Sequence, residues 1–141
     1  MSYRAAAALQ TAVYARLRDH EALADLIGDA VFDAMPVEPP TGTYVALGPE
    51  EARDASDQTG RGAQHDFVVS VLSGADAGEG FQAVKEAAVA VTEALEEAPL
   101  PMPLAKGILA GLWFLRAKAR RAEGGAGRRV DLTFRALVDL G

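Results

Sequence analysis

The chain has 141 residues, of which 50% are hydrophobic and 24% are charged. This composition excludes general disorder and suits one domain with a buried core. The formal net charge is −6, so a general attraction to nucleic acid is not expected. The absence of cysteine excludes disulfides and thiol catalysis. Because charges come too early for a signal peptide and no apolar run reaches roughly 18–20 residues, we expect a cytoplasmic protein without membrane contact, or part of a particle assembled in cytoplasm.

The N-terminal third predicts two helices and an extended connector. Apolar residues recur at helical spacing over residues 4–19, namely at Ala6, Leu9, Val13 and Leu17. A second helix is expected at 21–27, where Gly28 is placed to cap its end. The stretch "VFDAMPVEPPTGTY" follows, and its three prolines favour an extended connector because proline cannot donate a backbone hydrogen bond.

Two strands are predicted next, at 43–47 and 65–73, paired in antiparallel fashion. The second reads "HDFVVSVLS", in which apolar and polar residues alternate as in a half-buried strand. The connection between them, at about 48–64, exceeds the roughly 12–15 residues beyond which an unstructured loop is unusual. We therefore expect one domain over 1–141 with a long flexible loop at about 48–64.

The strongest helical pattern lies at 80–97. One stripe of this segment is apolar and the other faces carry charge, as in a helix that packs on a core. The stretch "APLPMPLAKG" then ends the helix, because its prolines cannot continue it.

The C-terminal part predicts a β-hairpin. The stretches "LAGLWFLRAKARR" and "RRVDLTFRALVD" alternate in polarity and flank the glycine-rich "AEGGAG". The two apolar sets must share one face of the hairpin. One register that achieves this pairs three sets of residues: Trp113 with Ala136, Leu115 with Phe134, and Lys118 with Asp131.

These elements predict an α+β fold. The sheet is expected to be roughly four-stranded and largely antiparallel, with helices packed on one face. The helix at 80–97 and the N-terminal helix would cover this face. The core is expected to include Phe67, Trp113, Leu115, Leu132 and Phe134.

The polar stretch "RDASDQTGRGAQHD", residues 53–66, could be an active-site loop, a metal loop or an assembly loop. It lacks the spacing of a calcium loop, which needs alternating Asp or Asn ligands, a central glycine and a late glutamate. Zinc would require several His or Cys ligands, and His65 is alone in this stretch. We therefore expect no metal and no cofactor.

Hydrolase chemistry is also disfavoured, and we expect no enzyme. Ser56 and His65 with an aspartate have the composition of a triad, but no "GxSxG" elbow is present. Asp54 and Asp57 could form a carboxylate pair, but a glycosidase also needs a sugar cleft lined by aromatic residues. A small enzyme using Asp54, Asp57 and His65 is kept as an alternative, which requires these side chains to converge in the monomer.

The charges are segregated along the chain. Half of the fourteen lysines and arginines lie between Arg116 and Arg135. Three interpretations stay open: a solvated strand face that blocks aggregation, a contact between neighbouring copies, or a contact with passing DNA. For the second, the candidate interface residues on the acidic loop and the basic hairpin are Glu50, Glu51, Asp54, Asp57, Arg61, Arg116, Lys118 and Arg120.

Several fragments, in order, resemble one known family. They are "LQTAVYARL", "LIGDAVFDAMP", "YVALG", a strand beginning at His65, a helix, and a closing hairpin with "FLR" and "FRALV". Together they resemble the small tail-completion, or tail-terminator, proteins of tailed phages and gene transfer agents. The resemblance covers nearly the entire chain, although "TGTY" departs from the apolar residue and proline that usually precede the tyrosine.

The resemblance implies a structural role without catalysis. Such proteins form a hexameric ring on the head-proximal end of the tail, where the ring ends polymerisation of the tail tube and joins the tail to the head connector. The implied partners are further copies of the chain, the tail-tube protein and the head–tail connector, with DNA passing through the lumen without being read. The expected location is the tail of a phage-like particle assembled in bacterial cytoplasm. Another connector or neck ring protein is the alternative.

Overall fold

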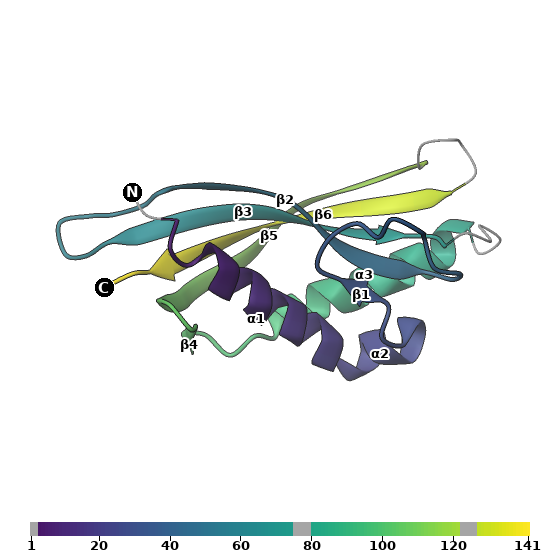
Figure 1. Cartoon of the computed structure of the whole chain (residues 1–141), viewed down its shortest axis with the longest axis horizontal. Coiled ribbons are helices and arrows are strands. Elements are labelled where there is room, and N and C mark those ends of the chain that lie inside the picture. The colour runs from purple at the N-terminus through teal and green to yellow at the C-terminus, as the bar shows by residue number, and fades with distance from the viewer. Residues whose placement is uncertain (1–2, 75–79, 122–126) are drawn as a thin grey trace.

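The computed structural model describes residues 3–74, 80–121 and 127–141 and shows an α+β fold (Figure 1). None of the helices in these segments is long and apolar enough to cross a membrane. The elements in chain order are α1 (Ala6–Asp19), α2 (Glu21–Ile27), β1 (Val31–Phe32), β2 (Tyr44–Asp54), β3 (Gly62–Leu72), α3 (Gly80–Glu96), β4 (Met102–Pro103), β5 (Ile108–Arg121) and β6 (Arg128–Asp139).

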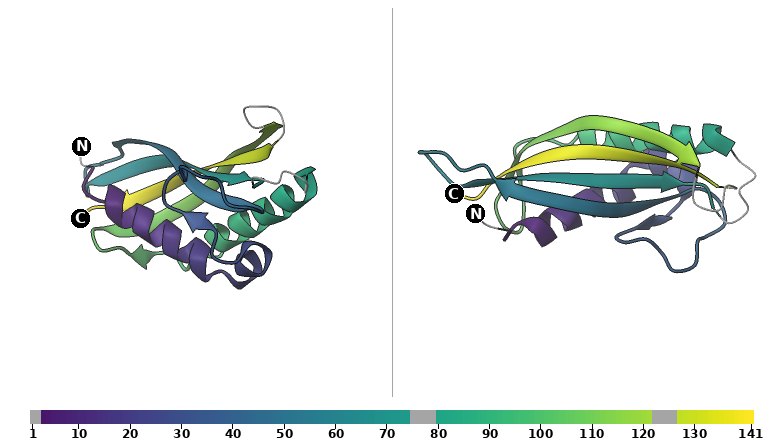
Figure 2. Two further views of the ribbon diagram at one scale, coloured as in Figure 1. Left: turned by 45° about the vertical axis from the view of Figure 1, so that its right-hand side comes forward. Right: turned by 90° about the horizontal axis from the view of Figure 1, so that it is seen from above.

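The described strands form one mixed sheet of six strands in the order β1-β2-β3-β6-β5-β4. The predicted count of about four strands is therefore wrong, and the β1–β2 pair is parallel while the other pairs are antiparallel. The two additional strands have only two residues each, too few to show an alternating pattern. The helices lie on one face of the curled sheet, as predicted (Figures 1 and 2).

The loop predicted at 48–64 is much shorter, because β2 and β3 form a long hairpin through most of this segment. β2 continues to Asp54, β3 begins at Gly62, and residues 55–61 make the turn. The strand predicted at 43–47 ends before Gly48. Instead, the register shifts between Leu47 and Glu50, and this bulge accommodates Gly48 and Pro49 within the strand. Whether the hairpin is flexible stays a prediction.

The core lies between the helices and the middle of the sheet. α1 and α3 contribute buried apolar stripes to it. Phe134 of β6 is fully buried, with its ring 5.7 Å from that of Phe67 and 5.8 Å from that of Phe114, measured between centroids. Leu132 is also buried, so Phe67, Leu132 and Phe134 are confirmed as core residues. Gly28 ends α2 with a φ of 66°, and its N–H donates to the carbonyl of Ala24 at 2.8 Å, as a capping glycine does.

The predicted register of the last hairpin is correct at one of its three pairs. Lys118 lies opposite Asp131, whereas Ala136 lies opposite Leu112 rather than Trp113. Phe134 lies opposite Phe114 because the register shifts between Phe114 and Arg116. This bulge adds one residue to β5 and moves the side chains from Gly111 to Phe114 to the other face, until a second shift between Leu109 and Gly111.

The bulge explains why two predicted core residues are exposed. Trp113 is 49% exposed and Leu115 is 37% exposed, so both expectations were wrong. Trp113 lies on the face away from the helices, where its ring covers Gly111. A Cβ atom at Gly111 would lie only 2.4 Å from the indole, so a larger residue there would displace the tryptophan.

Replacing Phe134 should test the position of the core. Phe134→Ala is expected to lower the free energy of unfolding by about 3–5 kcal/mol, because it leaves a cavity between two other rings. Phe114→Ala is the matched control, since that ring is 41% exposed and should cost clearly less. Urea unfolding of the two variants, at a protein concentration where each is a single copy, makes the comparison. Equal losses would contradict this placement of the core.

Candidate assembly surface

The side chains of the stretch 53–66 are used mostly within their own hairpin. Ser56 donates a hydrogen bond of 2.7 Å to Asp54. Asp57 accepts hydrogen bonds from the hydroxyl and N–H of Thr59, both at 2.8 Å, and from the N–H of Gly60 at 3.0 Å. The bonds from Thr59 and Gly60 lower the pKa of Asp57. These are contacts that shape a turn.

His65 is fully buried and belongs to a polar contact between strands. Its Nδ1 lies 2.9 Å from Oε2 of Glu50. Tyr3 donates a hydrogen bond to the other oxygen of Glu50, which raises the pKa of Tyr3. Glu50, a predicted interface residue, is therefore already held inside its own chain. The contact ties the start of the chain to the β2–β3 hairpin.

The alternative of a small enzyme requires Asp54, Asp57 and His65 to converge, and they do not. His65 contacts Glu50, whereas the two aspartates stay at the exposed end of the hairpin. Within the described segments no group of three or more His, Asp or Glu side chains could hold a metal ion. A hollow of about 940 Å³ lies elsewhere, between α1 and residues 102–106, and is lined by none of the three.

Ion pairs run across the face of the sheet that the helices leave open. Asp66 accepts two hydrogen bonds from Arg135, at 2.9 and 3.0 Å, and Arg53 lies 3.9 Å from it. The hydrogen bonds from Arg135, followed by the charges of Arg135, Arg53 and Arg116, lower the pKa of Asp66. This bidentate pair links β3 to β6.

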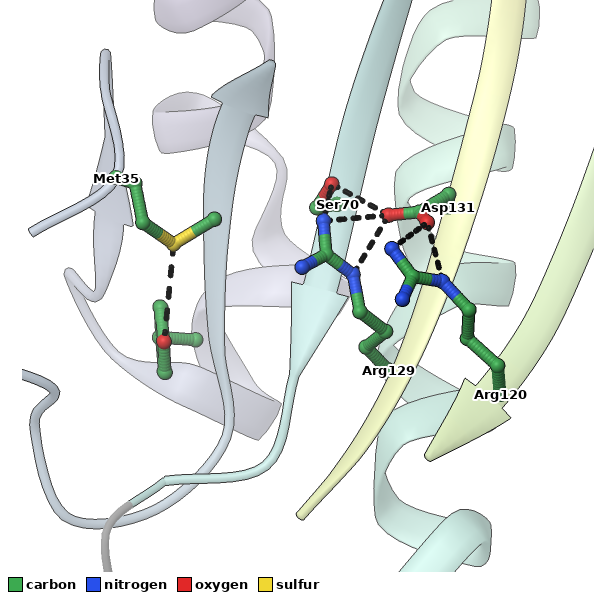
Figure 3. A network of polar contacts seen from close by, with 6 residues as sticks. Met35, Ser70, Arg120, Arg129 and Asp131 are labelled. Carbon is green, nitrogen blue, oxygen red and sulfur yellow. Dashed lines mark hydrogen bonds and ion pairs between the residues drawn. The ribbon is translucent and has the colours of Figure 1, made fainter. Parts of the chain in front are cut away.

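A second group surrounds Asp131 (Figure 3). Asp131 accepts hydrogen bonds from Ser70 at 2.7 Å and from Arg129 at 3.0 Å, and Arg120 lies 3.3 Å away. Burial alone would raise the pKa of Asp131, but the hydrogen bonds from Ser70 and Arg129 and the two arginine charges lower it overall. Arg120, a predicted interface residue, is thus already paired with its own chain.

Other predicted interface residues remain available to a partner. Arg116 and Lys118 are exposed on β5, and neither makes an ion pair within 4.0 Å in the described part of the chain. Glu51 of β2 is also exposed, and it takes part in none of the ion pairs found in the described part of the chain. Arg61 is exposed in the turn of the β2–β3 hairpin.

The predicted acidic and basic interface residues lie toward opposite edges of the sheet. β2 lies near one edge and β5 near the other, with β3 and β6 between them (Figure 2, right). A single chain therefore does not bring the two sets together. They can meet only between copies, which is compatible with the predicted subunit contact.

Sequence reasoning missed an apolar groove of about 650 Å³ between α3 and the distal half of β5. Val89 of α3 is 58% exposed in it, and Phe114 is 41% exposed. Ala117 and Ala119 line the same groove and are exposed too. The alternating apolar residues of β5 were a signal for this surface, but they had been assigned to the core.

Comparison with known proteins identifies the family of the chain. The family model "Tail completion protein gp17" matches residues 11–139. The chain belongs to this family. Membership confirms the resemblance seen in the sequence and indicates a structural tail component rather than an enzyme.

A solved structure gives a close match. One chain of the "Virion of native gene transfer agent (GTA) particle" is similar to this chain at 54% sequence identity, with a TM-score of 0.85. The match covers 98% of this chain and 99% of that chain. A search of curated proteins finds no match. The similarity therefore extends over nearly every element described above.

The Asp66–Arg135 pair should make the free energy of unfolding depend on pH in the acidic range. Because the pKa of Asp66 is lowered in the folded chain, its contribution is complete above the unfolded value of about 4 and is lost as pH falls through the folded value. Asp66→Asn should cost on the order of 1 kcal/mol at pH 7 and flatten the decline of stability in acid.

Urea unfolding between pH 7 and pH 3 measures this dependence. The matched controls are Arg135→Gln and the double variant Asp66→Asn with Arg135→Gln, which form a double-mutant cycle. The double variant should cost less than the sum of the two single changes. An unchanged acid decline in Asp66→Asn would show that this pair does not stabilise the fold.

Proposed function

We propose that this tail-completion protein is a tail terminator. Copies of it form a ring, expected to be a hexamer, at the head-proximal end of the tail tube, where it ends tube polymerisation and joins the tail to the head connector. The observation that carries the proposal is the 54% identity to a chain of a gene transfer agent virion over nearly the full length of both chains.

The charge pattern supports a contact between unlike surfaces of two copies. The acidic candidates and Arg61 lie on the β2–β3 hairpin, and the basic candidates lie on β5. A contact between two different surfaces of identical subunits is head-to-tail, and it generates a ring when the rotation closes. Among the basic candidates, Arg116 and Lys118 carry this role best, since Arg120 already contacts Asp131.

The proposal also sets location and partners. The protein acts in the tail of a phage-like particle that assembles in bacterial cytoplasm, next to the tail-tube protein and the connector. DNA passes through the lumen without sequence-specific binding. The net charge of −6 agrees with a chain that does not retain DNA.

A polymerisation assay tests the terminator role. Purified tail-tube protein is allowed to polymerise with and without this chain, and tube lengths are measured by electron microscopy. The expected result is shorter tubes, each with one end carrying the chain. Tubes of unchanged length, or chain bound along their sides, would overturn the proposal.

Reversing one exposed charge on β5 should weaken the ring. Lys118→Glu is expected to lower ring formation at least tenfold in low salt, because it places an acid where an acidic neighbour approaches. Its melting temperature as a single copy should fall only slightly, because Lys118 is exposed although the new acid lies opposite Asp131.

Lys106→Glu is the matched control, because Lys106 is exposed but lies between β4 and β5, next to the hollow at α1. Sedimentation at two salt concentrations measures association for both variants. If the two variants associate equally well, the contact does not involve the basic face of β5.

A further inference from the structure

The six-stranded sheet has two edges that its short outer strands leave open. β4 pairs with β5 only through Met102 and Pro103, so β5 has no described partner strand on its outer side from residue 110 onward. β1 pairs with β2 only at Val45 and Ala46, so the outer side of β2 is open over 47–54. Open edges present unpaired N–H and C=O groups and readily pair with another strand.

The two edges carry opposite charge. Segment 48–54 of β2 contains three acids and one arginine. Segment 110–121 of β5 contains four cations and no acid. Pairing of β5 with β5 would place cations opposite cations, which is unfavourable across strands. Pairing of β5 with β2 can bring Glu51 beside the β5 cations, because both face the open side of the sheet. Glu50 and Asp54 face the helix side, opposite Phe67 and Ala63.

The apolar groove lies beside the β5 edge. α3 extends past the line of β5 on its outer side (Figure 2, right). A strand added to β5 would therefore lie against α3 and cover the groove. It would take Val89 and Phe114 out of water, two apolar side chains that the single chain leaves 58% and 41% exposed. A neighbouring strand thus accounts for both the open edge and the exposed groove.

We propose that the β5 edge of one copy pairs through its main chain with the β2 edge of the next copy, so that the sheet continues from subunit to subunit. This inference rests on the proposed ring and specifies how its subunits join. Each copy offers one edge of each kind, so the contact repeats from copy to copy until the ring closes. The occupant of the β5 edge and its groove is a second copy of this chain.

The absence of cysteine makes the pairing testable by engineered disulfides. On β2, Ala52 lies opposite the buried His65 and faces the helices, so its neighbour Glu51 faces the open side. On β5, Ala117 and Ala119 face the helices, opposite buried Leu132 and Val130. The other positions of that segment, namely Arg116, Lys118 and Arg120, face the open side.

The test is a set of double variants made in the full chain and assembled with tail-tube protein. Glu51→Cys is combined in turn with Arg116→Cys, Ala117→Cys, Lys118→Cys, Ala119→Cys and Arg120→Cys. Disulfides between copies are expected only at alternate positions, on the open side, because paired residues in a sheet share a face. With Ala52→Cys in place of Glu51→Cys, the pattern should reverse to positions 117 and 119.

Native mass measurement of the same assemblies separates this inference from the ring itself. A ring with alternating disulfides supports both. A ring whose disulfides do not alternate along β5 overturns the strand pairing and leaves the terminator proposal standing. Disulfides between the β5 cysteines and the tail-tube protein would show that the tail-tube protein covers the β5 edge, and would overturn the inference. Absence of any ring would overturn both.

Discussion

The pairing of β3 with β6 is the contact on which the rest of the fold depends. It runs from Gly62 opposite Asp139 to Leu72 opposite Arg129 without a shift in register. It joins two hairpins, β2–β3 and β5–β6, that are distant in sequence. It also places Phe67 beside Phe134, beneath the helices. On the other face it holds the Asp66–Arg135 pair, so the same register satisfies both the core and the ion pairs.

This central pairing leaves a sheet that is longer than the helices can cover. The inner half of β5 contributes Leu109 to the core, whereas every residue from Trp113 to Arg121 is exposed. This part of β5 pairs with β6 on one side and has no described partner strand on the other. The proposed contact between copies would cover this exposed surface.

The amphipathic segments were the predictable part of the fold. Leu9, Val13 and Leu17 indicated the buried stripe of α1, and Gly28 indicated the end of α2. Short-range patterns failed where the backbone departs from regular geometry. A bulge at Gly48 and Pro49 hid half of β2, and a bulge beside Leu115 reversed the faces assigned to Trp113 and its neighbours. The alternation of polar and apolar residues does not reveal either bulge, because the extra residue can be of almost any type.

The candidate surface was predictable in its charges but not in its shape. Acidic and basic stretches are visible in the sequence, and so is the family resemblance. The open edges depend on strand order, which places β2 and β5 near the two ends of the sheet. The groove depends on where α3 crosses β5. The pairing of Glu50 with buried His65 also required the structure, since it joins residues across a bulged hairpin.

A density map of intact particles at a resolution that traces strands tests the account most directly. We expect a ring of this chain at the head-proximal end of the tail tube, in which β5 of each copy lies beside β2 of the next and the sheet continues around the ring. A chain found in the capsid shell or baseplate, or a ring in which β5 faces solvent or DNA along its whole edge, would contradict it.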